Sequence, residues 1–376
     1  VCVNAGLRWD GQFIVATNGH VAQKILGQWQ PRIGFIYFPG ESGTHKFLGS
    51  VGRFYQELST FPLQSYYREG GTDRHVIYDH DPREDPTGGN VIGGGPVVIQ
   101  PEIGNLEGQH YDEFTLGYER RLSENAKLGL RGIHRTLREG IETARDPETG
   151  QYQLNNFGKG LLSAYPKLTR DYTALEVVLQ YSPGDNRAFL ASYVLSKAYG
   201  NYPGLFNSDL DQALPNSSST LDWIEMVPNS TGRLPNDRPH VFKLAGSQRI
   251  GHGVSAGLSF TWQSGTPYCE WGAMENFTVP IAFASKRGTA GRSPGIWDLN
   301  IRFQYEPRLA IDSRFKPTLT LDLLHVASQR RPVFYDELHY RALDEEGNQA
   351  NPNSNFGRPI GYQPPMAMRL GMEVDF

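Results

Sequence analysis

Apolar and polar residues alternate one by one along several stretches of this chain, and this period of two limits its fold more than any other feature. Over 366–376 one face of an extended strand carries Met366, Met368, Leu370, Met372, Val374 and Phe376, and the other carries Ala367, Arg369, Gly371, Glu373 and Asp375. The same pattern recurs over 254–263 and 295–305. Because successive side chains of a β-strand point to opposite faces, the pattern predicts strands with one apolar and one polar face.

Weaker alternation predicts further strands elsewhere. They lie near 1–10, 30–38, 45–55, 111–119, 126–137, 171–182, 187–199, 239–249 and 317–325. With the three clearest segments, about twelve strands are expected. Since the alternation has already begun at Val1, we expect the N-terminus to be a cut end within a longer protein.

The lengths of the connections alternate between short and long. Tight turns are expected at 39–44, 122–125, 183–186 and 251–253, and long segments at 56–110, 138–170, 200–238, 264–294 and 326–364. Strict alternation places every long segment at one end of an antiparallel meander, with both termini near the other end. This is the layout of outer-membrane β-barrels, which have short periplasmic turns and long external loops. A soluble β-sandwich, the alternative, distributes long loops to both ends.

Composition agrees with a barrel and excludes other classes. Only 38% of the residues are hydrophobic, and no stretch approaches the ~20 apolar residues of a membrane-spanning helix. In a membrane barrel the two faces alternate, so hydrophobic content resembles that of a soluble protein. A net charge of −4 argues against a nucleic-acid partner.

Aromatic residues also favour the membrane interpretation. Tyr118, Tyr181, Trp262, Trp297 and Tyr305 lie near strand ends on the apolar face, as in an aromatic girdle at a membrane interface. Phe376 ends the final alternating strand and has the form of the assembly signal of outer-membrane proteins. The sequence therefore predicts contact with outer-membrane lipid and with the barrel-assembly machinery.

Several short motifs, in this order, resemble the barrel of TonB-dependent receptors, in particular the Oar-like group. They are Asn4–Asp10 (NAGLRWD), Pro31–Phe35 (PRIGF), Gly52–Tyr55 (GRFY), Tyr193–Leu205 (YVLSKAYGNYPGL), Asn236–His240 (NDRPH) and Ser264–Tyr268 (SGTPY). The resemblance covers most of the chain apart from the long loops.

The resemblance implies an all-β fold in which this chain, residues 1–376, forms the C-terminal half of a barrel of about 22 strands. Alone it is expected to form an open half-barrel. The plug domain and the TonB-box of such receptors are absent from this chain. The implied function is active uptake of a scarce or large solute across the outer membrane, energised by the TonB–ExbB–ExbD complex. The solute itself is not identified.

Two other functions remain open. The same barrel could serve adhesion or assembly without import, or it could carry a hydrolase. The second alternative rests on Gly253–Gly257 (GVSAG), which fits the nucleophile-elbow pattern around Ser255. That elbow needs a helix after the serine, and here a strand is expected, so we do not predict an enzyme. Acidic residues in 78–85 could bind a hard cation, but a solvated loop is the simpler interpretation, and no metal or cofactor is predicted.

Candidate solute contacts follow from strand parity. Arg131, Arg302 and Arg369 lie on the polar faces of their strands, where charges of a barrel lumen tune selectivity. Alternatively they only pair with Glu176, Asp298 or Glu373. External aromatic residues, Tyr199, Tyr202 and Trp271, could contact a solute or simply pack the loops together.

Two further expectations concern geometry. Seven apolar side chains should point to the convex outside and stay exposed: Leu258, Phe260, Leu299, Ile301, Phe303, Leu370 and Met372. The charged Asp298, Arg302, Arg369 and Glu373 should point to the concave side. Cys2 and Cys269 are expected at opposite ends of a membrane core ~30 Å thick, too far apart for a disulfide.

Overall fold

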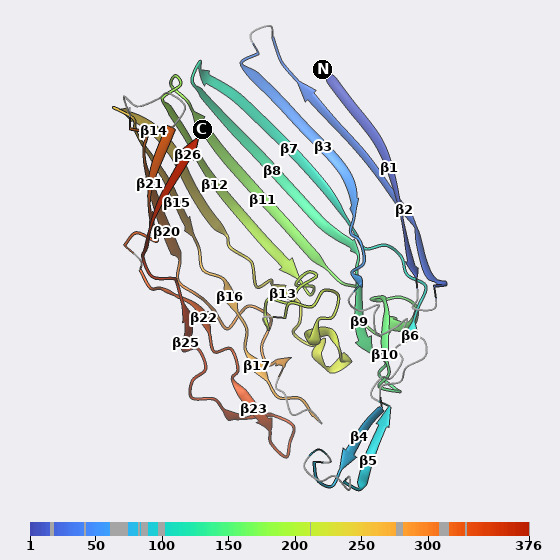
Figure 1. Cartoon of the computed structure of the whole chain (residues 1–376). Coiled ribbons are helices and arrows are strands. Elements are labelled where there is room, and N and C mark those ends of the chain that lie inside the picture. Colours follow the sequence, from blue (N-terminus) through green and yellow to red (C-terminus); the bar gives the residue numbers. More distant parts are fainter. Residues whose placement is uncertain are drawn as a thin grey trace.

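A computed structural model of the chain describes residues 1–15, 19–40, 43–60, 74–81, 83, 89–96, 102–210, 212–275, 281–307, 316–327 and 329–375. Its main feature is one large antiparallel sheet that curves into an open wall (Figure 1). We call the twelve long strands of this sheet the wall. In order of pairing they are β1 (Cys2–Val15), β2 (Val21–Tyr37), β3 (His45–Tyr55), β7 (His110–Ser123), β8 (Ala126–Glu139), β11 (Arg170–Tyr181), β12 (Arg187–Gly200), β14 (His240–Gly251), β15 (Val254–Gln263), β20 (Ile296–Tyr305), β21 (Lys316–Leu324) and β26 (Ala367–Asp375).

The order of pairing follows the chain, so the predicted antiparallel meander of about twelve strands is confirmed. Within the described residues, β1 pairs only with β2 and β26 only with β21, which leaves both edges of the wall unpaired. The expected open half-barrel is therefore what the chain forms. In the described part of the chain, no helix has the length and apolarity needed to cross a membrane.

The turns of the wall divide into two kinds, as predicted. At the end where both termini lie, β7 and β8 are joined by residues 124–125, and β14 and β15 by His252 and Gly253 (Figure 1). His252 and Gly253 both have positive φ, 53° and 80°, which is the geometry of a tight hairpin turn. The long segments all leave the opposite end, which we call the external end.

The first two strands are longer than predicted. Alternation indicated 1–10 and 30–38, whereas β1 and β2 extend over Cys2–Val15 and Val21–Tyr37. Their pairing shifts in register between Asp10 and Gln12, so the period of two is interrupted there. Beyond the shift the faces carry mixed residues, such as the buried Gln28 and Ile25, and the alternation is lost.

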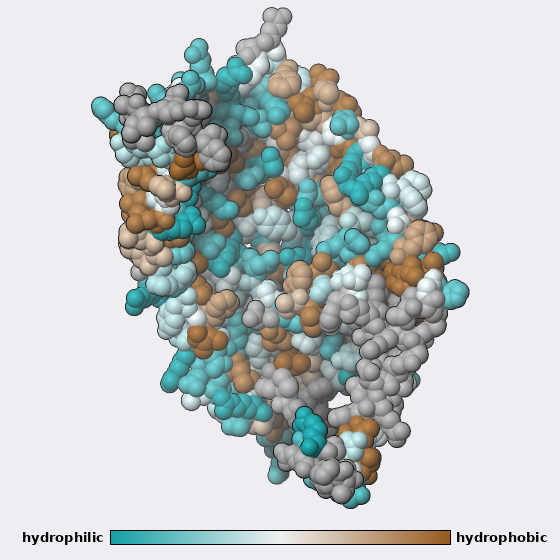
Figure 2. Space-filling view, in the orientation of Figure 1, coloured by the Kyte–Doolittle hydropathy of each residue, from teal (hydrophilic) through white to brown (hydrophobic). Residues whose placement is uncertain are grey.

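The two faces of the wall have opposite chemistry. Register places Leu258 beside Ile301 and Ile301 beside Leu323, so apolar side chains form continuous rows across strands. Of the seven side chains predicted to face outward, Leu258, Phe303, Leu370 and Met372 are exposed and Phe260, Leu299 and Ile301 half-buried, which confirms the prediction. Figure 2 shows the hollowed face of the wall, with hydrophilic residues spread across its strands.

The long segments fold together into a second body, which we call the cap. It consists of the described residues within 56–109, 140–169, 201–239, 264–295 and 325–366. Its small elements are β4 (Arg74–Tyr78) with β5 (Val91–Pro96), β6 (Glu102–Ile103) and β9 (Ile141–Arg145) on either side of β10 (Tyr152–Asn156), β13 (Gly232–Arg233), β16 (Pro267–Tyr268) with β19 (Gly291–Arg292), β17 (Trp271–Gly272) with β18 (Ala282–Phe283), β22 (Pro332–Tyr335) with β25 (Pro359–Tyr362), β23 (Tyr340–Leu343) with β24 (Gln349–Pro352), and the 3₁₀ helices η1 (Gly160–Leu162), η2 (Ser219–Leu221) and η3 (Ile224–Met226).

Most of the buried apolar side chains of this chain lie in or beside the cap. The largest cluster gathers Leu137, Ala144, Phe157, Leu162, Tyr165, Leu168, Tyr202 and Leu221. A second cluster joins Ile14 and Ile25 of the first two strands to Leu58, Leu106, Ile141 and Leu154. The external end of the wall therefore carries a packed interior, while the strands below it have none.

The cysteines lie at opposite ends, as predicted. Cys2 is exposed at the start of β1, and Cys269 is buried in the cap between β16 and β17. Both are free thiols.

Candidate functional site

The concave face of the wall brings two of the predicted arginines together. Register sets Arg302 beside Asp322 and Asp322 beside Arg369. Arg302 donates from Nε to Asp322 Oδ1 at 2.5 Å and from Nη2 to Oδ2 at 3.0 Å, and Arg369 donates from Nη2 to Oδ2 at 2.7 Å. Asp322 is 4% exposed, so the two guanidinium groups cover it completely.

This arrangement corrects the alternative pairing stated above. Arg302 does not pair with Asp298, nor Arg369 with Glu373. Asp298 instead accepts from Asn300 and lies 2.7 Å from Nδ1 of His325. The reason is register, since residues directly opposite on neighbouring strands lie much closer than residues four positions apart on one strand.

The Arg302–Asp322–Arg369 group holds two positive charges and one negative charge. The arginine side chains remain 52% and 66% exposed, so some of their N–H groups face open space. Arg302 and Asp322 line a concavity of about 700 Å³ together with Asn300, Ser259, Gln180 and Leu190. An excess guanidinium beside hydroxyl and amide groups can bind the carboxylate or phosphate of a polar solute.

Arg131 lies on the same face of the wall, in a separate site. Its Nη1 is 3.9 Å from Glu176 Oε2, so the predicted pairing with Glu176 is present but long. Arg131 lines a smaller concavity of about 120 Å³ beside Glu119, Lys127 and Gln180. Gln180 borders both concavities, so polar groups continue along the concave face from β8 to β21.

The predicted aromatic contacts lie at the external end, with different exposure. Tyr202 is fully buried in the largest cluster of the cap, and Trp271 is buried against Phe283 with ring centroids 4.5 Å apart. Both positions fit the packing alternative. Tyr199 is half-buried, and Lys197 Nζ lies 4.9 Å and Lys286 Nζ 5.7 Å from its ring centroid.

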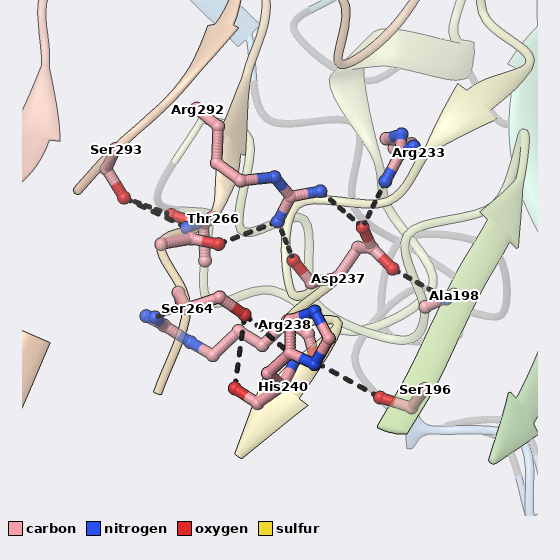
Figure 3. A network of polar contacts seen from close by, with 11 residues as sticks. Ser196, Ala198, Arg233, Asp237, Arg238, His240, Ser264, Thr266, Arg292 and Ser293 are labelled. Carbon is pink, nitrogen blue, oxygen red and sulfur yellow. Dashed lines mark hydrogen bonds and ion pairs between the residues drawn. The ribbon is translucent and has the colours of Figure 1, made fainter. Parts of the chain in front are cut away.

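A buried carboxylate fastens the cap to the wall, and the sequence analysis did not assign it. Asp237 accepts the backbone N–H of Ala198 at 2.8 Å, Arg233 at 3.3 Å and Arg292 at 2.6 Å (Figure 3). Arg292 also donates to the carbonyl oxygens of Asp237 and Gly265, at 2.7 and 2.6 Å. The ends of β12, β13 and β19 thus meet at one carboxylate.

Arg238 and His240, which follow Asp237 in the motif NDRPH, hold β14 to the end of β15. Arg238 donates to the carbonyl oxygen of Ser264 at 2.6 Å, and Ser264 Oγ accepts the N–H of His240 at 2.9 Å (Figure 3). A Cβ at Gly265 would overlap the carbonyl oxygen of Ser293, so only glycine fits there. The motifs NDRPH and SGTPY, quoted above only as a resemblance, were therefore the signal for this network.

A second buried ion pair joins two segments of the cap, 201–239 and 264–295. Arg287 is fully buried, and it pairs with Asp209 and donates to the carbonyl oxygen of Asn201 at 2.9 Å. Asp209 Oδ1 lies 4.0 Å from Cys269 Sγ. Neither Arg287 nor Asp209 belongs to a recognisable pattern, so sequence reasoning had no means of finding them.

Three carboxyl groups of the cap are wholly or partly removed from water: Glu142 is fully buried, and Asp222 and Glu337 are half-buried. Burial raises the pKa of Glu142 well above its ordinary value, although its carboxylate accepts the backbone N–H groups of Thr143 and Ser218. Burial likewise raises the pKa of Asp222 to about 6 and that of Glu337 to about 7. Loss of contact with water therefore moves the titration of all three carboxyl groups to higher pH.

The remaining sequence candidates give no site. Ser255 lies in β15, directly after the β14–β15 turn, so strand rather than helix follows it. Among the described residues no cluster of His, Cys, Asp and Glu could hold a metal ion. Part of the acidic segment 78–85 and the terminal Phe376 fall outside the described residues.

Comparison with known proteins gives one sequence relative and many structural ones. No family model matches the chain. The TonB-dependent transporter Oar of Myxococcus xanthus is 28% identical over all of this chain, which spans 41% of that protein's length.

Solved structures show the same fold at low identity. The siderophore receptor PiuA of Acinetobacter baumannii matches 100% of the chain with 40% of its own, at a TM-score of 0.52 and 12% identity. YddB, an outer-membrane transporter of Escherichia coli, matches 100% of this chain with 50% of its own length, at a TM-score of 0.52 and 9% identity. The FrpB iron transporter of Neisseria meningitidis (F3-3 variant) matches 98% of this chain with 42% of its own length, at a TM-score of 0.54 and 10% identity. Together, the likeness to Oar along the whole sequence and this shared fold support a barrel portion of a TonB-dependent receptor of the outer membrane.

Proposed function

We propose that the protein containing this chain imports a scarce or large solute across the outer membrane. The observation that carries the proposal is the likeness to a TonB-dependent transporter along the whole of the chain. Since the chain spans less than half of that relative, import is a property we assign to the longer protein. Residues 1–376 supply part of its barrel domain, and a plug domain and TonB-box outside this chain supply gating and contact with TonB–ExbB–ExbD.

Within this function the concave face forms one side of the solute path. The Arg302–Asp322–Arg369 group presents an excess positive charge to the concavity of about 700 Å³ on this face. Arg131 presents a second, weakly paired guanidinium on the same face. We assign these arginines to transient binding of an anionic group of the solute, because arginine forks match carboxylate and phosphate geometry. Tyr199 has the same parity as the outward Tyr193 and Leu195, so we assign it to the convex side of the external end and not to the solute path.

The convex face contacts outer-membrane lipid, and Phe376 serves recognition by the barrel-assembly machinery. No catalytic step is assigned, since Ser255 lies within a strand hairpin and a nucleophile elbow requires a following helix. Nucleic acid and resident cofactors have no place in this function.

Import is tested in the bacterium that makes the protein. The coding region is deleted and restored with the full-length gene, and depletion of solutes from spent medium is followed by mass spectrometry. We expect one class of solute to be depleted only by the restored strain, and only while TonB is present. If the deletion abolishes surface attachment and leaves depletion unchanged, the adhesion alternative replaces import.

The role of the arginines is tested in the same strain. The double substitution R302Q/R369Q should slow depletion of that solute about tenfold, because a tenfold change corresponds to the free energy of roughly one charge-assisted hydrogen bond. Arg120 of β7 is the matched control, since register places it on the opposite, convex face. If R120Q slows depletion equally, the arginines act through folding and not through the solute path.

A further inference from the structure

The convex face of the wall carries a groove that changes character along its length. It has a volume of about 630 Å³ and crosses β1, β2, β3, β7 and β8. Its apolar side chains are Ala5, Pro31, Ile33, Val51 and Phe114, and the larger ones are about half exposed: Ile33 50%, Val51 48% and Phe114 52%. They belong to the same outward rows as the lipid-facing residues of the wall.

The external end of the groove is charged. Arg53 stands two residues beyond Val51 on β3, and Asp112 stands two residues beyond Phe114 on β7, so both share the outward face. His134, Thr136 and Arg138 of β8 also line this end, and Gly6, Arg32, Gly52 and Glu113, whose parity is that of the concave face, border the groove. A charged side chain in the middle of the lipid-facing belt costs about 2–4 kcal/mol, and near the interface about 0–1 kcal/mol. The charges therefore mark the level at which the hydrocarbon ends and lipid headgroups begin.

One carboxylate orients two guanidinium groups at this level. Arg53 donates to Asp112 from Nε at 2.8 Å and from Nη2 at 3.1 Å, and Arg138 donates to Asp112 Oδ2 from Nε at 3.0 Å. The Arg138 side chain is 54% exposed, and the bond to Asp112 uses only its Nε. The group holds one positive charge in excess, with His134 beside it.

We propose that this groove binds a phosphorylated lipid of the outer leaflet. An acyl chain would lie along Ile33, Val51 and Phe114, and the headgroup phosphate would accept hydrogen bonds from Arg138 and Arg53. Arginine pairs with phosphate bidentately, and basic pockets on a membrane protein at headgroup level recognise anionic lipids. The site is separate from the solute path, which lies on the concave face.

The wall offers a matched control for this site. Arg135 of β8 donates to Glu113 of β7 on the concave face, beside the Arg138–Asp112 pair on the convex face. R135Q therefore removes an arginine from the same two strands that does not itself line the groove. R138Q is the test variant, because Asp112 keeps its two bonds from Arg53 and no carboxylate is left uncompensated.

The experiment uses the full-length protein in detergent and native mass spectrometry, with diphosphoryl lipid A as the probe. We expect R138Q to weaken retention of the probe about tenfold and R135Q to leave it unchanged. Dephosphorylated lipid A should be retained weakly, and equally, by all three proteins.

Three results would overturn the proposal. They are equal retention of the probe by R138Q and the parent protein, equal binding of phosphorylated and dephosphorylated lipid by the parent, and full displacement of the probe by millimolar inorganic phosphate. The last would mean a site for a free anion. None of these outcomes depends on whether the protein imports a solute.

Discussion

In the wall, Leu370 leaves 73% of its surface exposed, whereas Leu154 in the cap leaves none. The two leucines belong to one chain and differ in the solvent that surrounds them. The wall exposes its apolar rows to lipid and keeps polar groups on the concave side. The cap stands in water and buries apolar side chains in an interior, as a soluble domain does. The same residue type therefore contributes to stability by burial in the cap and by lipid contact in the wall.

Matched phenylalanine substitutions should give the largest contrast. Phe157 is 2% exposed in the cap, and Phe303 is 39% exposed on the wall. F157A should destabilise the cap by about 3–5 kcal/mol through loss of packing and creation of a cavity, and F303A should cost less than about 1 kcal/mol. Hydrogen exchange of cap and wall amides in the full-length protein measures both. Equal costs would mean that the cap has no independent interior.

Matched arginine insertions test the faces of the wall. Ile301 lies in an outward row and Asn300 on the concave face. I301R should cost about 2–4 kcal/mol, because the charge must enter hydrocarbon, and N300R should cost about 1 kcal/mol or less. Urea unfolding of the full-length barrel in lipid vesicles measures the difference. The reverse order of the two costs would show that the faces have been assigned the wrong way round.

The half-buried carboxyl group of Asp222 makes the cap sensitive to pH. Its pKa rises from 3.8 to about 6 on folding, so between these values the folded state binds more protons than the unfolded state. The stability of the cap should therefore fall as the pH rises from about 4 to about 6, by at most about 3 kcal/mol, and then stay level. Exchange protection of β9 and β10, corrected for intrinsic rates, follows this change.

D222N is the control for the pH effect, since an amide does not titrate. It should flatten the profile of β9 and β10, while the amides of β7 and β8 in the wall stay independent of pH in both proteins. A steep profile that persists in D222N would assign the effect to Glu142 or Glu337 instead.

The smallest effect is expected for the exposed ion pair of the wall. Arg131 and Glu176 are 49% and 29% exposed at the side chain and 3.9 Å apart, so E176Q should change stability by less than about 1 kcal/mol. D237N in the cap removes charge from a carboxylate that is fully buried and should cost more. Thermal unfolding of the two variants, side by side, ranks them. A larger loss for E176Q would contradict the contrast between wall and cap.

The same contrast explains what the sequence could predict. The wall follows a period of two, so its strands, its faces and the short turn at 251–253 could be predicted from neighbouring residues alone. Arg302 and Arg369 could be assigned to the concave face by parity, but their shared partner Asp322 could not, because register between strands is set by the whole sheet. Within the cap, Asp237 had a motif as its signal, whereas the buried pair of Arg287 and Asp209 joins residues that no local pattern connects.

The hydrogen bonds of the cap join parts of the chain that are far apart. Asn216 donates to the carbonyl oxygen of Ile141, 75 positions away, and Arg287 donates to that of Asn201, 86 positions away. Hairpins such as β7–β8 close over a few residues, at a lower cost in chain entropy. We therefore expect the hairpins to form first and the cap to form last. Since the segments of the cap leave the wall separately between different strands, we expect them to cross the bilayer as unfolded chain and to find one another only at the cell surface.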